Sequence, residues 1–176
     1  MDLKQEFLHD QFLSMSISAS LQHAGIYKDK IRDDERLVFR VALGRILLEI
    51  SADYKNPVSE SRHEENIELL VQMMSDQFGG LFKDGKYRIG LAQKALNLYL
   101  KYLWCEEEIP APPHCPFDRM IIEELLKEKP INWTDMDDMK DYRQLVSAAR
   151  EKAQGVSLAE WELKTYQKIL KDSKEL

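Results

Sequence analysis

The sequence predicts an all-α protein, a compact bundle of about seven helices in one domain over residues 1–176. Apolar residues recur with the 3.6-residue period of a helix in every segment long enough to judge, and no run alternates as a strand would. The chain holds 44% hydrophobic residues but only 7 Gly and 6 Pro, which is typical of a folded helical domain. A chain of 176 residues buries about two thirds of its surface, so it needs no metal or disulfide to fold.

The first three helices are predicted from their end signals. The first is expected over residues 3 to about 23, where Gly25 follows its last turn. The second begins with acids that suit the positive end of the helix dipole, and it covers about 33–55 before Pro57 stops it. The third follows a Ser-x-x-Glu capping box at 61–64 and ends at a Gly-Gly pair.

A central fourth helix is expected at about 89–104, followed by a proline-rich segment at 109–119 that redirects the chain. Asp118 is well placed to cap a short fifth helix, which ends before the next proline. Capping patterns at 134–137 and 157–160 then predict two further helices. No long linker separates these elements, and no period of 20 to 50 residues repeats, which favours a bundle over a solenoid.

The central helix carries a narrow polar arc. At 100° per residue, one arc of about 100° contains nearly all its polar side chains, while other directions are apolar or tyrosine. The arc holds Gln93, Trp104, Asn97, Gly90, Lys101 and Lys94. A helix of this kind is buried on most sides. This polar arc is therefore the strongest functional lead in the sequence.

Three residues of the arc have the best spacing for a ligand. Lys94, Asn97 and Lys101 lie three and four residues apart, so two ammonium groups and an amide can converge on a carboxylate or phosphate. The alternative interpretation is that these residues form the solvent-facing edge of a half-exposed helix. The complete candidate ligand site adds Arg88, Trp104 and His114.

Charge is unevenly distributed along the chain. Five bases against one acid give residues 83–104 a net charge of +4, whereas ten acids against four bases give residues 105–140 a net charge of −6. The basic segment can hold an anion, or it can pair internally with its acidic neighbours. Aromatic residues among the bases leave local nucleic-acid binding by residues 83–101 as an alternative, although a pI near 5.3 disfavours general phosphate binding.

The proline segment holds reactive side chains without a recognisable catalytic pattern. His114 and Cys115 are adjacent, so in an extended stretch they point to opposite faces and form no nucleophile–base pair. With Cys105 they supply three metal ligands but no C-x-x-C pair, so neither a metal nor a cofactor is expected. Cys115 is instead expected to fill the core. An enzyme without a standard motif, using the cleft between the central helix and residues 109–119, remains an alternative.

The sequence gives no sign of export or of a membrane span. The first ten residues lack a basic start followed by an apolar stretch, and no run approaches about 20 uninterrupted apolar residues. A cytoplasmic protein with reduced cysteines is expected, and homodimerisation stays open. The sequence thus predicts a soluble binding protein that recognises a small anionic ligand or a protein partner through the polar arc of its central helix.

Overall fold

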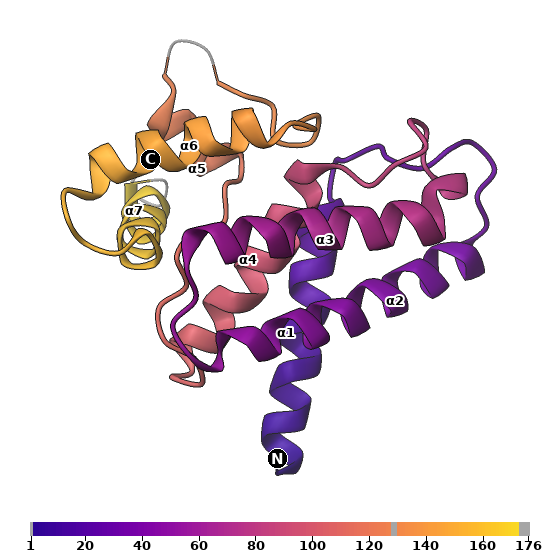
Figure 1. Cartoon of the computed structure of the whole chain (residues 1–176), viewed down its shortest axis with the longest axis horizontal. Helices are drawn as coiled ribbons and strands as arrows, with labels where there is room; N and C mark the ends of the chain where they lie inside the picture. Colours follow the sequence, from indigo (N-terminus) through magenta and orange to yellow (C-terminus); the bar gives the residue numbers. More distant parts are fainter. Residues whose placement is uncertain (1, 128–129, 173–176) are drawn as a thin grey trace.

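A computed structural model describes residues 2–127 and 130–172, and over these residues it contains seven α-helices and no β-strand (Figure 1). The predicted all-α fold class is confirmed. The helices are α1 (Leu3–Leu21), α2 (Asp33–Ser51), α3 (Glu60–Phe78), α4 (Ile89–Cys105), α5 (Arg119–Leu125), α6 (Met139–Ala153) and α7 (Leu158–Asp172). Short 3-10 turns follow α2 and α3, at Ala52–Lys55 and Gly79–Leu81.

Two predicted helix starts were wrong. The N-cap of α3 is Ser59 rather than Ser61, because the Ser59 hydroxyl accepts a hydrogen bond from the third amide of the helix. The N-cap of α6 is Asp138 rather than Thr134. The Thr134 amide and hydroxyl both donate to the side-chain oxygen of Asn132, so this residue belongs to a turn before the helix.

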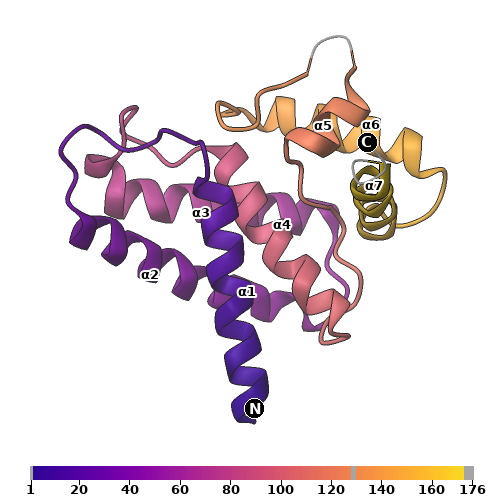
Figure 2. The same ribbon diagram turned by 180° about the vertical axis from the view of Figure 1, so that it is seen from behind.

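The helices form two groups that meet at α4. Helix α4 packs against α1, α2 and α3, while α5, α6 and α7 pack against one another and α6 also contacts α4. Figures 1 and 2 show the C-terminal three helices lying to one side of the first four, with the N-terminal half of α1 projecting from the bundle. The predicted central position of α4 is confirmed, since twelve of its 17 residues are buried.

The start of α4 fits closely against the loop that precedes α6. The backbone amide of Gly90 donates to the carbonyl of Met136 at 2.8 Å. A β-carbon at Gly90 would lie 1.7 Å from the Trp133 carbonyl oxygen, so any larger residue would push the loop away. Glycine is therefore required here for close approach, and the contact fixes how the C-terminal helices sit on α4.

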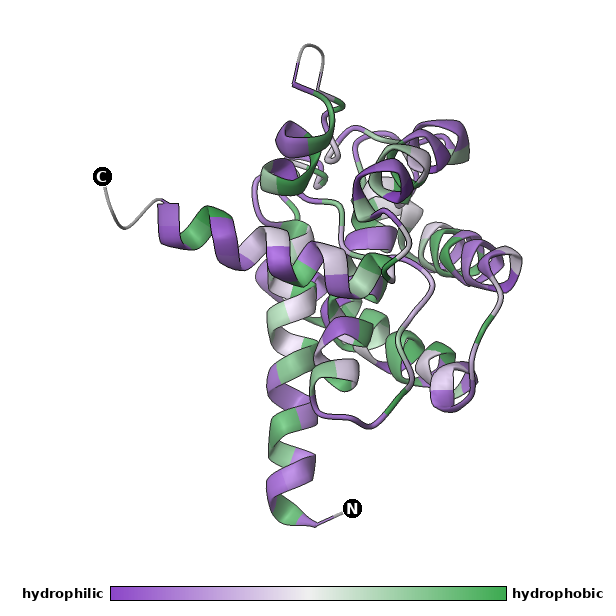
Figure 3. Cartoon of the chain, turned by 90° about the vertical axis from the view of Figure 1, so that its left-hand side faces the viewer, coloured by the Kyte–Doolittle hydropathy of each residue, from purple (hydrophilic) through white to green (hydrophobic). Residues whose placement is uncertain are grey.

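Hydrophilic and hydrophobic residues are interspersed along the helices, as Figure 3 shows. Within residues 2–127 and 130–172, no helix is both long enough and apolar enough to cross a membrane.

Candidate functional site

The polar arc of α4 is enclosed by the rest of the protein. Gln93 and Asn97 are fully buried and Lys101 is only 9% exposed, because the proline segment, α6 and α7 cover this side of the helix. The interpretation of the arc as a solvent-facing edge was therefore wrong. These buried residues and their partners form what we call the polar seam, which joins α4 to the C-terminal part of the chain.

The three side chains predicted to converge have separate partners. The ammonium of Lys94 lies 4.1 Å from the ring centroid of Trp133. The amide nitrogen of Asn97 donates to a backbone carbonyl of the proline segment at 2.9 Å. The ammonium of Lys101 donates to Glu162 of α7 at 2.9 Å in a buried ion pair. The expected convergence on one spot was wrong, and whether any of these residues binds a ligand stays a prediction.

The other charges of the basic segment are largely paired within the chain. Arg88 forms ion pairs with Asp84 and with Asp135, and Lys86 pairs with Asp137. The structure therefore places the basic segment against its acidic neighbours. This agrees with the interpretation that the segment pairs internally. Trp104, also in the candidate set, is partly buried and packs against the hydrophobic core. His114, the last candidate, belongs to a buried hydrogen-bonded chain.

This hydrogen-bonded chain of side chains begins at Tyr54, next to α3. The Tyr54 hydroxyl accepts a hydrogen bond from the Asn66 amide at 3.3 Å and lies 2.7 Å from Nδ1 of His63. A phenol oxygen can accept more than one hydrogen bond, so this contact fits either tautomer of His63, with the proton on Nδ1 or on Nε2.

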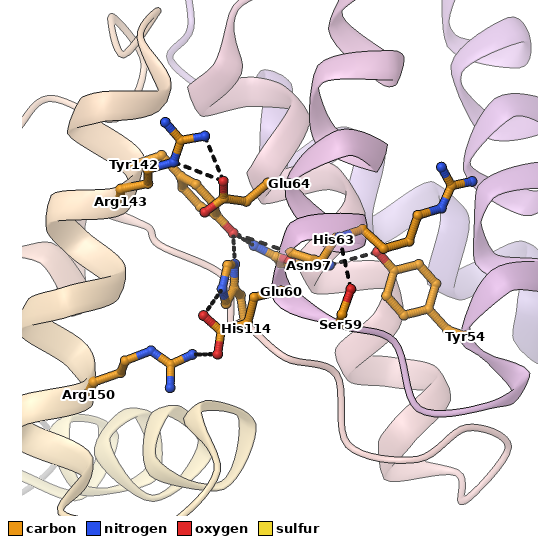
Figure 4. A network of polar contacts seen from close by, with 11 residues as sticks. Tyr54, Ser59, Glu60, His63, Glu64, Asn97, His114, Tyr142, Arg143 and Arg150 are labelled. Atoms are coloured by element: carbon orange, nitrogen blue, oxygen red, sulfur yellow. Dashed lines mark hydrogen bonds and ion pairs between the residues drawn. The ribbon is translucent and has the colours of Figure 1, made fainter.

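The chain continues across to α6. Nε2 of His63 lies 3.4 Å from the Tyr142 hydroxyl, which also accepts from the Asn97 amide at 3.2 Å. The Tyr142 hydroxyl also lies 2.8 Å from Nδ1 of His114. Figure 4 shows these side chains meeting between α3, α4 and α6. Because Tyr142 of α6 contacts side chains of α3, α4 and the proline segment, this hydrogen-bonded chain is a structural lock between the two groups of helices.

The outer end of this chain faces two ion pairs. Nε2 of His114 has no hydrogen-bond partner and lies 3.9 Å from a carboxylate oxygen of Glu60, which pairs with Arg150 of α6. Glu64 pairs similarly with Arg143 at 2.7 Å (Figure 4). These pairs bridge α3 and α6 at the surface.

Burial keeps both histidines of the chain neutral. Desolvation lowers the pKa of His63 to about 4, and it lowers the pKa of His114 further, to about 2, with His63 and Arg150 adding to the effect. Neither side chain has any exposed surface. Groups that are neutral and inaccessible are poor candidates for acid–base catalysis near neutral pH.

The two cysteines are both free, and they differ in environment. Cys115 is fully buried and burial raises the pKa of its thiol well above the usual range, whereas Cys105 is exposed at the end of α4. A buried thiol with a raised pKa is unreactive. The expectation that Cys115 fills the core is confirmed, since it is 1% exposed within the main hydrophobic cluster.

A different cluster of polar side chains lies in an open groove between α1 and α2. Sequence analysis did not identify it. The groove has a volume of about 740 Å³. Its lining residues are Met15, Ser18, Ala19, Leu21, Gln22, Tyr27, Arg36, Arg40 and Tyr102. Two of these are arginines and none is acidic, so we call it the arginine groove.

The polar groups of the arginine groove are incompletely paired. Arg40 donates to the Ser18 hydroxyl at 2.6 Å, and the Arg36 guanidinium lies 5.0 Å from the ring centroid of Tyr27. Nε of Arg36 and the Tyr27 hydroxyl are buried without a hydrogen-bond partner. The closest carboxylate, fully exposed Asp33, is 3.9 Å from Arg36. Buried donors without acceptors are uncommon in folded proteins and call for an explanation.

The electrostatics of the groove indicate that its polar groups face one another. Burial raises the pKa of Tyr27, while the positive charges of Arg40 and Arg36 oppose that rise. Both guanidinium groups therefore act on the same hydroxyl. Over the part of the chain that the structure describes, Arg40 forms no ion pair at all.

A second, smaller pocket of about 320 Å³ includes Lys94, Arg119 and Trp133. It also contains the carboxylate of Asp118, whose charge acts on Lys94, and Arg119 is paired with Glu123 at 2.7 Å. Its positive charge is therefore partly neutralised, and the arginine groove is the better candidate. No family model, no curated protein and no solved structure matches this chain.

Proposed function

We propose that the protein binds a small anionic ligand in the arginine groove. One observation carries the proposal: two arginines line a groove that has no acidic residue in its wall. Arg40 has no ion-pair partner among the described residues, and Arg36 has only the fully exposed Asp33 at 3.9 Å, so the positive charge of the groove is largely uncompensated and would attract an anion. The class of ligand is the one expected from the sequence, but the site lies between α1 and α2 instead of on the polar arc.

The donors in the groove favour a phosphate or carboxylate head group. A guanidinium is planar and presents parallel N–H groups that match the oxygens of these anions. Nε of Arg36 and the Tyr27 hydroxyl are buried, so a head group would bind first to the accessible guanidinium nitrogens and would reach these two donors only after the side chains move.

The remainder of the groove favours an apolar or aromatic body on the ligand. Met15, Leu21 and Tyr102 contribute apolar surface to the wall, and Tyr102 is stacked on Phe12 with ring centroids 5.1 Å apart. A volume of about 740 Å³ lies within the usual range for small-molecule sites, roughly 300–1,000 Å³. The ligand class is therefore a monoester phosphate or a carboxylate attached to an apolar group.

Calorimetric titration with phenyl phosphate and octanoate tests this proposal, with phenol and octanol as uncharged counterparts. At least one charged probe should bind, its uncharged counterpart should bind much more weakly, and added salt should weaken the charged probe. Arg36→Gln and Arg40→Gln should each weaken binding about tenfold or more, which corresponds to loss of one charge-assisted contact.

Lys152→Gln is the control, because Lys152 is an exposed cation on α6 that does not line the groove. It should leave the affinity unchanged. Failure of every charged probe to bind, or binding that survives both groove substitutions, would overturn the proposed function.

A further inference from the structure

Exposed large hydrophobic side chains are concentrated on two helices. Among the described residues twelve such side chains are exposed, and eight of them lie on α1 and α2. Those on α1 are Leu3, Phe7, Leu8 and Met15, and those on α2 are Leu37, Val38, Val41 and Leu48. Apolar surface gathered in one region indicates an interaction site more strongly than the same residues scattered singly.

The first part of α1 forms an arm that the rest of the protein does not cover. Residues 3–8, 10 and 11 are all exposed, and Figures 1 and 2 show this half of the helix projecting from the bundle. Leu3 is 82% and Phe7 61% exposed. Phe7 lies nine residues before buried Ser16, which puts it on the opposite side of the helix. These apolar side chains therefore gain nothing from the fold of a single chain.

The outer face of α2 is a second uncovered apolar surface. Leu37, Val41 and Leu48 fall within about 40° of one another around the helix, so they form one stripe. Leu37 and Val41 are 61% and 66% exposed. Arg45 lies next to this stripe, one turn after Val41, and has no ion-pair partner in the described chain.

The charges of the two surfaces are complementary. Residues 2–10 carry three acids against one lysine, and Glu6 and Asp10 lie beside the Leu3–Phe7 stripe. Neither acid forms an ion pair within residues 2–127 and 130–172. His9 pairs with Glu108, at 2.7 and 2.8 Å to its two oxygens, and this contact fixes the direction of the arm. An acidic apolar arm and an apolar face with an unpaired arginine thus occur in the same chain.

We propose that two copies of the chain form a homodimer in which the arm of each lies across α2 of the other. A two-fold arrangement uses both surfaces twice, so residue pairs between arm and α2 occur in duplicate and no arm is left open for further assembly. Leu3 and Phe7 would pack on Leu37 and Val41. Glu6 or Asp10 would then reach Arg45.

Sedimentation equilibrium of the full chain over a wide concentration range tests the dimer. The parent should approach twice its monomer mass of 20.6 kDa. Phe7→Glu and Val41→Glu should each shift it to monomer, because each buries a carboxylate in the interface. The matched control is Val156→Glu, an exposed valine before α7, which should leave the mass unchanged.

A charge exchange makes the test independent of folding defects. Arg45→Glu and the combination Glu6→Arg with Asp10→Arg should each weaken the dimer, and all three substitutions together should restore it. Circular dichroism at the same concentrations checks that helix content is retained. A parent that stays monomeric, a dimer that persists in Phe7→Glu and Val41→Glu, or a monomer that instead co-sediments with anionic lipid vesicles would overturn the proposal.

Discussion

The polar seam and the arginine groove place similar side chains in opposite situations. In the seam, Lys101 forms an ion pair with Glu162. The Tyr142 hydroxyl accepts a hydrogen bond from Asn97 and lies 2.8 Å from Nδ1 of His114. In the groove, Arg36 and Tyr27 keep buried donors that no group of the protein accepts. Buried atoms without a hydrogen-bond partner also occur in the seam, at Oδ1 of Asn97 and Nε2 of His114, so unpaired atoms alone do not distinguish the two regions. The difference lies in charge: the buried cation of the seam has a carboxylate partner, whereas Arg40 of the groove has no ion-pair partner among the described residues.

The largest effect in this comparison is expected at the buried ion pair of the seam. Lys101→Ala removes the cation that pairs with Glu162, whose side chain is 4% exposed. Burial already raises the pKa of Glu162 despite the opposing charge of Lys101. Leaving that carboxylate without its partner should lower the free energy of unfolding by about 3–5 kcal/mol, as measured by urea denaturation.

A double variant distinguishes loss of the pair from loss of packing. Lys101→Met combined with Glu162→Leu removes both charges and keeps the side-chain volumes similar, so it should recover most of the stability. If Lys101→Ala unfolds with the parent's midpoint and slope, the pair contributes nothing and the seam is not a structural lock.

The next effect is a dependence of stability on pH caused by neutral His63. Its pKa falls from an ordinary value near 6.5 in the unfolded chain to about 4 in the folded one. The unfolded state therefore binds a proton first as the pH drops, so the stabilisation is complete above about 6.5 and is lost towards pH 4. His63 alone should contribute a loss of about 3 kcal/mol over this window.

Urea unfolding at a series of pH values measures this loss. His63→Gln should flatten the dependence by about 1.4 kcal/mol per pH unit between pH 6.5 and 4. His23→Asn is the matched control, because His23 is exposed and its backbone has a φ of 59°, which asparagine tolerates. A parent and His63→Gln variant with parallel pH profiles would contradict the assignment of a buried neutral imidazole.

A smaller effect is expected from the hydroxyl that joins the two histidines. Tyr142→Phe keeps the ring and removes the hydroxyl that contacts Asn97, His114 and His63. Three buried partners lose a contact, so the free energy of unfolding should fall by about 1–3 kcal/mol. Tyr166→Phe in α7 removes a partly exposed hydroxyl and should change it little. Equal stability of the two variants would show that the hydrogen-bonded chain through Tyr142 does not stabilise the fold.

The helices could be predicted from the sequence because their signals are local. Asp118 caps α5 as expected, and Gly25 and the Gly79–Gly80 pair mark the ends of helices. The start of α3 was displaced because Ser59 and Ser61 are both acceptable caps, and only the path of the preceding chain selects one. Local chemistry therefore gave the number and order of helices, with errors of a few residues at their ends.

The partners of the polar arc could not be predicted, since they are distant in the sequence. Tyr142 is 45 residues from Asn97, and Glu162 is 61 residues from Lys101. A helical wheel identifies a polar arc but does not say whether solvent, a ligand or another helix covers it. The arginine groove had one local signal: Arg40 has no acidic residue three or four positions away on its helix. Its contact with Ser18 still depends on how α1 and α2 pack.

The smallest effect on stability is expected in the arginine groove, and it distinguishes groove residues from seam residues most directly. Arg36→Gln and Arg40→Gln remove an exposed ion pair with Asp33 and a hydrogen bond to Ser18, and they leave no buried carboxylate behind. The free energy of unfolding should change by no more than about 0.5 kcal/mol, or should rise slightly, whereas binding of the charged probe should be lost. Urea denaturation and calorimetric titration of the same samples give both quantities. A groove substitution that destabilises the protein as much as Lys101→Ala would mean that these arginines also hold the fold together, and the distinction between seam and groove would fail.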